Sequence, residues 1–417
     1  MPLLYDRISV KNFKSIKDVT LDLGKLNVLV GPNGSGKSNL LEAFLFARSV
    51  VRPASFPPYP FAPWWGYQNI VFGQDTKNNV EFRVEGKTGK GVPFSYSFVL
   101  NGAGDNVNLL DEDLRVGDEL NFQRRGSLIS IENGKVSQAQ MQARPGINDR
   151  YAINLKDNRY SIFSLMMALS TEKYGAYEDR YLALRPDLVE AAAPVILAGR
   201  PENLSAFDEV FQSFFKDVLY LSYESSLAKA PIPPLTGVGT HGEGIASSLF
   251  SRYGVSIPGG YLNDFLKEYG LSISYNLWHG QAVSLKLVEQ GLQLDVPGIP
   301  DGYLKMITIL HMLDMRPSLL LIDELENSLH LKLIELAISA FRSFEGKVVV
   351  TTHSPMVVDL VDPSELILLE KSSKENEVPS TVAMRVTDPE KIKQRLARDG
   401  LALSESWLYG DLEENLG

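Results

Sequence analysis

The chain has 417 residues, of which 44% are hydrophobic and 22% are charged, a composition that predicts a globular protein and excludes a disordered one. It contains no cysteine, which excludes disulfides, thiol catalysis and cysteine-ligated zinc. A net charge of −10 argues against a uniformly basic nucleic-acid-binding protein but leaves a local basic groove open. Since no apolar run reaches the roughly 18 residues that span a bilayer and no leader-like segment opens the sequence, we expect a cytoplasmic protein without membrane contact.

The first elements in chain order are a pair of strands, a buried strand and a helix. Residues 3–23 alternate between apolar and polar side chains around a turn at 15–18, a pattern typical of two strands. The short apolar run 26–30 predicts a buried strand, and residues 39–47 predict a helix. A glycine-rich loop, residues 31–38, connects the buried strand to the helix.

That loop reads Gly-Pro-Asn-Gly-Ser-Gly-Lys-Ser and matches the pattern G-x-x-x-x-G-K-[ST] of phosphate-binding loops, with glycines at Gly31 and Gly36. The glycines let backbone N–H groups wrap phosphate oxygens, and the following helix presents the positive end of its dipole to them. Lys37 supplies a charge at the terminal phosphates, and the Ser38 hydroxyl is a ligand for Mg²⁺. An ordinary glycine turn is the disfavoured alternative, because the strand and helix are the context that the motif requires. We therefore predict ATP and Mg²⁺ as cofactors.

The middle of the chain carries less information. Residues 51–66 are rich in proline and aromatic side chains without a period and predict an irregular loop. Residues 69–135 contain runs of alternating apolar and polar side chains that are separated by Gly-rich turns, which predicts an antiparallel sheet. Residues 160–250 show helical spacing without sustained heptads, and 271–370 return to strands and helices. We infer an α/β P-loop NTPase fold with an antiparallel β lobe and an inserted helical subdomain.

Two further strands end in polar residues. Residues 318–322 are apolar and are followed by Asp323, a candidate Mg²⁺ ligand, and by Glu324, a candidate base for the attacking water. A buried strand with a capping acid pair is the alternative, and the upstream phosphate-binding loop favours the catalytic interpretation. The strand 347–352 carries His353 at its end, where it can contact the γ-phosphate. A histidine satisfied within the core is the alternative there.

Taken in order, these parts resemble the ABC-type ATPase heads of the RecF/SMC/OLD-like branch, and more narrowly its small AAA-type, RecF-like members. The resemblance covers roughly residues 1–50 and 290–360. It is carried by the segments 11–16, 31–39, 323–330 and 351–355.

The resemblance implies a role for each matching residue. Asp323 would be the Walker B acid that holds Mg²⁺ together with Ser38, Glu324 would be the catalytic base and His353 the switch histidine. Residues 326–330 would form a loop that crosses to a partner subunit. A signature loop before the Walker B strand would complete the partner's ATP site through Asp301 and Gly302. The remaining nucleotide contacts would come from Lys14, Asn33, Gly34, Ser35, Gly36, Lys37, Ser38 and Asn39.

The sequence departs from the family pattern near the signature loop and after the Walker B strand. Pro300 stands where the family usually has the serine of Ser-Asp-Gly, so a hydroxyl aimed at the partner's γ-phosphate is missing. This puts the hydrolysis rate and the standard dimer geometry in question. Leu325 replaces the usual proline after the Asp-Glu pair. The Q-loop glutamine has two candidates, Gln68 and Gln123, which the sequence does not separate.

We divide the chain into three domains. Residues 1–155 would form an N-terminal ATPase lobe with the phosphate-binding loop and the antiparallel sheet, and 156–265 a helical insertion. Residues 266–417 would form a C-terminal ATPase lobe with the signature-like loop, the Walker B strand and the switch histidine. Only 64 residues follow His353, too few for the Toprim nuclease of OLD proteins, and a coiled coil of SMC length is absent. We expect a stand-alone ATPase that closes around ATP as a homodimer or a higher homo-oligomer.

Three functions compete. The first is an ATPase whose ATP-driven dimerisation regulates a separately encoded effector, a nuclease or toxin, which would suit phage defence. The second is a DNA repair or recombination clamp of the RecF type, which needs a basic face for DNA. The third, an ABC transporter subunit, is disfavoured because residues 12–15 and 328–330 are typical of the other branch. The basic residues that could form the DNA face of the second function are Arg124, Arg125, Arg144, Arg150 and Arg159 in the middle region and Lys391, Lys393, Arg395 and Arg398 near the C-terminus. The C-terminal four lie on a predicted helix, for which a solvated helix face is the favoured interpretation.

Overall fold

The fold was taken from a computed structural model, in which the chain divides into two compact units. The first unit comprises residues 1–23, 38–216 and 370–383, and the second comprises 24–37, 217–369 and 384–417. The structure describes residues 4–51, 60–103, 106–118, 120–126, 128–133, 150–154, 210, 218–230, 237–254, 256, 258–278, 282–372 and 377–410. Most of the predicted helical insertion at 156–265, including Arg159, therefore lies outside the described residues, as does Arg144. Each unit is described by itself.

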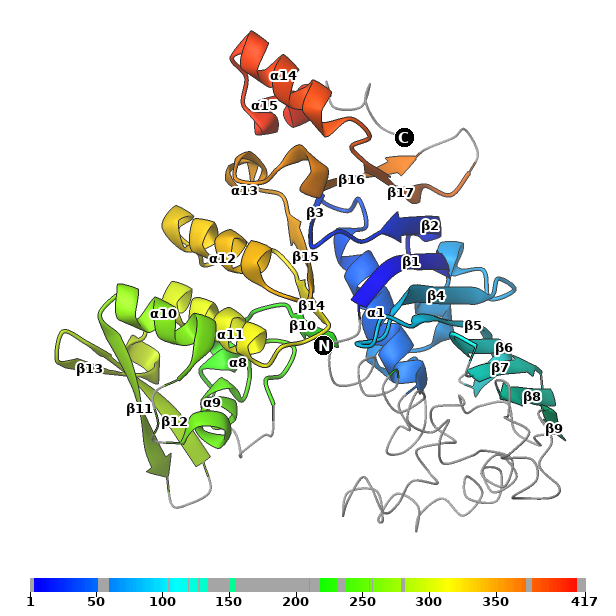
Figure 1. The fold of residues 1–417 in the computed structure, drawn as a ribbon, viewed down its shortest axis with the longest axis horizontal. Helices are drawn as coiled ribbons and strands as arrows, with labels where there is room; N and C mark the ends of the chain where they lie inside the picture. The colour runs from blue at the N-terminus through cyan, green and yellow to red at the C-terminus, as the bar shows by residue number, and fades with distance from the viewer. Residues whose placement is uncertain are drawn as a thin grey trace. The chain divides into compact units, whose positions relative to one another are not determined.

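An antiparallel sheet forms the main part of the first unit, with the strand order β2-β1-β4-β5-β6-β7-β8-β9 (Figure 1). Side chains along β4 alternate between buried and exposed positions, as expected for a sheet with one covered face. The predicted antiparallel β lobe is thus confirmed. Its strands are β1 (Leu4–Phe13), β2 (Ile16–Asp22), β4 (Val80–Lys87), β5 (Pro93–Ala103), β6 (Asn106–Val116), β7 (Leu120–Arg125), β8 (Leu128–Asn133) and β9 (Arg150–Asn154).

Helix α1 (Lys37–Val51) packs against this sheet through a cluster of buried aromatic rings. The ring of Phe46 lies 5.3 Å from that of Phe13 in β1 and 6.3 Å from that of Phe98 in β5, measured between centroids. Phe44 meets Phe82 of β4 edge to face at 5.9 Å. Pairs of this kind contribute about 0.5–1.5 kcal/mol each beyond the burial of their area. Short 3₁₀ turns follow α1 at Ala62–Trp64, Tyr67–Asn69 and Phe72–Gln74.

The second unit is built on a parallel sheet in which β10 (Val218–Leu221), β14 (Leu319–Ile322), β15 (Lys347–Thr352), β3 (Leu26–Val30) and β16 (Leu366–Ser372) follow one another in this order. Strand β17 (Ser380–Arg385) follows β16 in the sheet order. All residues of β3 and β14 are buried, which is the pattern of strands covered on both faces. Because the strands are parallel, the C-terminal ends of β14, β15 and β3 open at one edge of the sheet, where ligands of such folds bind.

The helices of the second unit share one hydrophobic core with these strands. A small antiparallel sheet of three strands, β11 (Leu271–Trp278), β12 (Ala282–Glu289) and β13 (Leu292–Asp295), joins the same core. Among the described residues no helix is both long and apolar enough to cross a bilayer. The helices are α8 (Ser225–Ala228), α9 (Ile245–Tyr253), α10 (Gly260–Glu268), α11 (Asp301–Asp314), α12 (Leu331–Ser343), α13 (Pro355–Asp359), α14 (Pro389–Asp399) and α15 (Leu403–Leu408), with 3₁₀ turns at Val296–Gly298 and Pro363–Glu365.

One region differs from the expected helix. Residues 160–250 were predicted helical, yet β10 within them is a strand that pairs in parallel with β14. A run of four apolar residues is too short for periodicity to distinguish a strand from a helix. The tertiary pairing makes residues 218–221 a strand, because they fill the edge position of the parallel sheet next to β14, the strand that precedes Asp323.

Candidate functional site

The phosphate-binding loop begins where β3 ends and requires a glycine at its first position. A side chain on Gly31 would place its Cβ 2.1 Å from the carbonyl oxygen of Leu369, so only glycine permits this approach of two backbones. Gly34 and Gly36 have φ values of 80° and 106°, a region that other residues rarely adopt. The glycines at these positions thus have the backbone conformations that the loop requires, and the wrapping of phosphate oxygens by its N–H groups stays a prediction.

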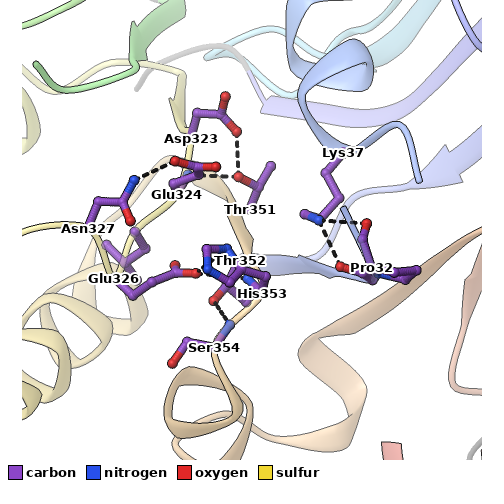
Figure 2. Close-up of polar contacts among 12 residues, drawn as sticks. Pro32, Lys37, Asp323, Glu324, Glu326, Asn327, Thr351, Thr352, His353 and Ser354 are labelled. Carbon is purple, nitrogen blue, oxygen red and sulfur yellow. Dashed lines mark hydrogen bonds and ion pairs between the residues drawn. The ribbon is translucent and has the colours of Figure 1, made fainter. Parts of the chain in front are cut away.

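Lys37 closes the loop and turns its side chain back onto it (Figure 2). Its Nζ donates hydrogen bonds to the carbonyl oxygens of Gly31, at 2.7 Å, and Pro32, at 3.1 Å. Burial lowers the pKa of Lys37, and the carboxylates of Glu326, Asp323 and Glu324 oppose this effect. The structure thus brings the loop lysine into the electrostatic field of the acids that follow β14.

The acids at the end of β14 are held by the neighbouring strand. Thr351 in β15 donates its hydroxyl hydrogen to Asp323 Oδ1 at 2.5 Å, and its Oγ1 accepts a hydrogen bond from the Glu324 N–H at 2.8 Å. One threonine therefore fixes both members of the pair. Leu325 N–H donates to the Thr351 carbonyl at 3.1 Å, a bond that a proline at position 325 could not make. This gives the departure from the family pattern a physical role.

The turn after these acids is strained and is held by a buried cation. Glu324 and Ser328 have φ values of 50° and 63°, and left-handed backbone costs about 1–2 kcal/mol for a residue other than glycine. Lys305 of α11 is fully buried, and its Nζ donates to the carbonyls of Glu324, Leu325 and Asn327 at 2.9, 3.1 and 2.8 Å. Burial lowers the pKa of Lys305 to about 8, whereas the nearby carboxylates raise it. All three ammonium hydrogens are thus used to hold the turn.

We expect Lys305→Met to destabilise the protein by about 1–3 kcal/mol, because the buried carbonyl oxygen of Leu325 loses its partner, and the part-buried carbonyl oxygens of Glu324 and Asn327 lose the same donor. Methionine keeps much of the side-chain length and adds no charge. Urea unfolding followed by circular dichroism measures the change. Lys332→Met, at an exposed position on α12, is the control. A loss below about 0.5 kcal/mol, the range of ordinary surface substitutions, would show that the turn does not depend on Lys305.

His353 follows β15 and is held by Glu326, two residues beyond Glu324 (Figure 2). Glu326 Oε1 accepts the backbone N–H of His353 at 2.8 Å and lies 3.0 Å from His353 Nδ1. Glu324 makes a different contact, since its Oε2 accepts a hydrogen bond from the Asn327 amide. The predicted residues Asp323 and Glu324 are thus joined through Thr351, His353 contacts Glu326, and Lys37 bonds to the phosphate-binding loop, while all of them follow the ends of neighbouring parallel strands.

The signature-like residues lie at the start of α11 and contact other parts of the second unit. Asp301 forms an ion pair with Lys229 at 2.6 Å and accepts a hydrogen bond from Ser225 at 2.6 Å, and these contacts lower its pKa. A Cβ on Gly302 would lie 2.7 Å from the Ser328 carbonyl oxygen. Gly302 is thus needed for the packing of α11 against the turn at 324–328, whether or not it also meets a partner subunit.

Three predicted nucleotide contacts lie in the first unit. Lys14, with φ of 51°, forms an ion pair with Glu42 of α1. Asn39 donates from its side chain to the Ser15 hydroxyl at 2.7 Å. Ser38 is the second residue of α1, directly after Lys37. In the loop itself, Asn33 and Gly34 are exposed, whereas Ser35 is buried. Contacts between Lys14, Ser38 or Asn39 and a nucleotide remain predictions. No structural contact distinguishes Gln68 from Gln123 as the Q-loop residue.

The sequence analysis missed the supporting residues of this site. Thr351 and Lys305 were not singled out for roles, and Glu326 was expected only in the loop 326–330 that crosses to a partner subunit, not as a contact of His353. Glu326 follows Glu324 by two positions, and a second acid at that spacing was a usable signal. Lys305 left a signal as well, because a lysine within an otherwise apolar helical run must find a partner when it is buried.

The group of residues fits ATP and Mg²⁺. The glycine-rich loop and Lys37 suit the polyphosphate of ATP. Asp323 supplies a carboxylate oxygen, the kind of ligand that Mg²⁺ prefers. The parallel sheet has one strand, β3, that ends in such a loop and another, β14, that ends in two acids, with β15 between them. This arrangement defines a P-loop nucleoside triphosphatase.

Comparison with known proteins narrows this class. A family model described as "AAA domain, putative AbiEii toxin, Type IV TA system" matches residues 26–137 and 288–359. The chain is 39% identical over 82 residues to the DNA replication and repair protein RecF of Magnetococcus marinus, which is 18% of this chain and 22% of RecF. It is 51% identical over 48 residues to the OLD nuclease of Thermus scotoductus, 12% of this chain and 9% of that protein.

A longer match is to the ATP/GTP phosphatase of Helicobacter pylori, with 22% identity over 232 residues that cover 49% of this chain and 60% of that protein. The chain thus spans less than two thirds of each of these relatives. A solved structure of the Smc head domain from Pyrococcus furiosus, bound to the C-terminal domain of ScpA, aligns with a TM-score of 0.45 and 12% identity over 95% of this chain and all of that one. The family and sequence matches, together with the motifs, support an ABC-type ATPase of the RecF/SMC/OLD-like branch.

Proposed function

We propose that the chain binds ATP with Mg²⁺ and hydrolyses it at the group formed by Lys37, Asp323, Glu324 and His353. The observation that carries this proposal is that the phosphate-binding loop, the acid pair and His353 follow the C-terminal ends of three successive parallel strands, β3, β14 and β15, at one edge of the sheet. Lys37 would neutralise the terminal phosphates, and Asp323 with Ser38 would hold Mg²⁺. Glu324 would accept the proton of the attacking water, and His353 would contact the γ-phosphate.

We further propose that two copies close around ATP and that this closure regulates a partner. Pro300 and Asp301 lie exposed at the start of α11, which supports a signature loop offered to a facing protomer. One protomer would contribute the phosphate-binding loop and the acids, and its partner the loop at Asp301 and Gly302. The closed pair would exclude water, and hydrolysis would release it. A separately encoded nuclease or toxin in phage defence is the effector that we favour.

The alternative, a DNA clamp of the RecF type, needs unpaired basic side chains on one face. Several candidates are occupied by acids of the same chain. Arg124 is fully buried beside Glu112, and Arg125 contacts Asp113. On α14, Lys393 forms ion pairs with Asp362 and Glu390, and Arg395 and Arg398 contact Asp399. Salt-dependent binding of duplex DNA, measured with and without ATP, distinguishes the clamp from an effector-regulating ATPase.

We expect Mg²⁺ and a slowly hydrolysed ATP analogue to convert the chain to a dimer in light scattering, with an ATPase rate per chain that rises with protein concentration. Pro300→Ser should raise that rate roughly tenfold, because it adds a hydroxyl donor where negative charge develops. Pro300→Ala removes the ring without adding a donor and is the matched control. A wild-type chain that stays monomeric yet hydrolyses ATP at a concentration-independent rate would refute the closed dimer.

A further inference from the structure

Two glutamates follow β14, and the structure gives them different surroundings. Glu324 is exposed, and its carboxylate contacts only the neighbouring Asn327 among the hydrogen-bond partners described here. Glu326 turns inward, so that 11% of its side chain is exposed, compared with 47% for the side chain of His353 that it holds. The acid in the catalytic position is therefore not the acid that contacts the histidine.

Glu326 holds His353 at two points through a single oxygen atom. Its Oε1 accepts the backbone N–H of His353 and lies within hydrogen-bond distance of Nδ1, at 2.8 and 3.0 Å. The two residues follow adjacent parallel strands, β14 and β15, so the contact joins the two strand ends at the ligand-binding edge of the sheet. The backbone hydrogen bond fixes the position of the residue, and the 3.0 Å contact between Oε1 and Nδ1 favours this orientation of the ring.

This contact determines which ring nitrogen carries a hydrogen. A carboxylate oxygen only accepts, so Nδ1 must be the donor and Nε2 is left for another partner. Partners of this kind fix tautomer and ring orientation for histidines in functional sites. The other oxygen, Oε2, is buried and has no hydrogen-bond partner among the described residues. A buried carboxylate is costly unless it is compensated: Glu326 contacts His353 and its backbone N–H, and the ammonium groups of Lys37 and Lys305 act on it electrostatically.

We propose that Glu326 is a positioning residue that holds the His353 ring with its hydrogen on Nδ1 and thereby reserves Nε2 for the terminal phosphate of the bound nucleotide. The contact between Nε2 and the terminal phosphate rests on the proposed function. The position of the hydrogen on the His353 ring does not. Neutral imidazole in water favours the hydrogen on Nε2, so the Glu326 contact reverses the ordinary preference. Glu326 itself touches neither the nucleotide nor the attacking water.

A double-mutant cycle tests the route through the histidine. Glu326→Gln keeps the shape and weakens the acceptor, and it should lower kcat roughly 10-fold or more, the range found when the partner that orients a functional histidine is removed. In the His353→Ala background the same substitution should cause no further loss, because the ring through which Glu326 acts is absent. Glu335→Gln, at an exposed position on α12, is the control. Losses that multiply in the double variant would overturn the proposal.

A second readout does not depend on ATP hydrolysis. The chain has five histidines, so the imidazole signals in a ¹⁵N spectrum are few, and His353→Ala identifies the one that belongs to His353. The wild type should show the hydrogen on Nδ1, and Glu326→Leu should shift it towards Nε2. A wild-type ring with its hydrogen on Nε2 refutes the inference even if ATP is hydrolysed. A ring in the expected form in a protein without ATPase activity would instead refute the proposed function.

Discussion

Lys37→Ala should abolish ATP binding at cellular nucleotide concentrations. Lys37 is the only cation in the loop 31–38, and its Nζ already lies at the loop carbonyls of Gly31 and Pro32. A charge-assisted contact to phosphate oxygens is among the stronger polar interactions in proteins, so we expect Kd to rise at least about 100-fold, which corresponds to roughly 2.7 kcal/mol. Isothermal titration with Mg²⁺ and a slowly hydrolysed ATP analogue measures the change.

Lys25→Ala is the matched control for this substitution. Lys25 is exposed and lies just before β3. Lys25→Ala therefore removes a lysine side chain close to the phosphate-binding loop but outside it. A circular dichroism melt of both variants shows whether the fold is intact. Unchanged affinity in a folded Lys37→Ala protein would remove residues 31–38 from the nucleotide site.

Glu324→Gln should leave ATP affinity nearly unchanged and lower kcat by roughly 10²–10⁴, because an amide cannot accept the proton of the attacking water. The substitution suits this position for a structural reason. Glutamine keeps the length of the side chain and an oxygen that can accept from Asn327. The left-handed backbone at residue 324, φ of 50°, is equally strained in both proteins. Stability should therefore change little.

Without turnover, the closed form cannot open through hydrolysis, so Glu324→Gln with ATP should accumulate as a dimer in light scattering. Glu345→Gln, at an exposed position between α12 and β15, is the control for the loss of one carboxylate. Hydrolysis at the wild-type rate would show that Glu324 is not the base. A variant that loses ATP binding instead would indicate that Glu324 holds the metal.

The strands at the site could be predicted almost residue by residue. The expected strands at 26–30 and 347–352 coincide with β3 and β15, because continuous β-branched and apolar runs between polar ends leave few alternatives. The helix after the loop was also expected, although α1 continues beyond residue 47 to Val51. These elements depend on local patterns, which a single sequence displays directly.

The contacts that hold the site could not be predicted in this way. The bond of Lys305 to the turn at 324–327 depends on how α11 packs against a loop some twenty residues later. Asp301 was expected to face a partner subunit, and its ion pair with Lys229 joins residues more than seventy positions apart. Such pairs are set by tertiary packing, and neither periodicity nor motif spacing carries that information.

The position of β3 in the sheet has a consequence for synthesis. β3 lies between β15 and β16, and its Leu26 pairs with Val348, about 320 residues later in the chain. The side chain of Asn27 reinforces this pairing through a bond to the Val348 carbonyl, and Gly31 packs on the backbone of Leu369. A ribosome that adds about 5–20 residues per second makes β3 wait roughly 15–65 s for both neighbours. In a nascent chain β3 therefore lacks both neighbouring strands, and the close approach of Gly31 to the Leu369 backbone forms only after β16 has been made.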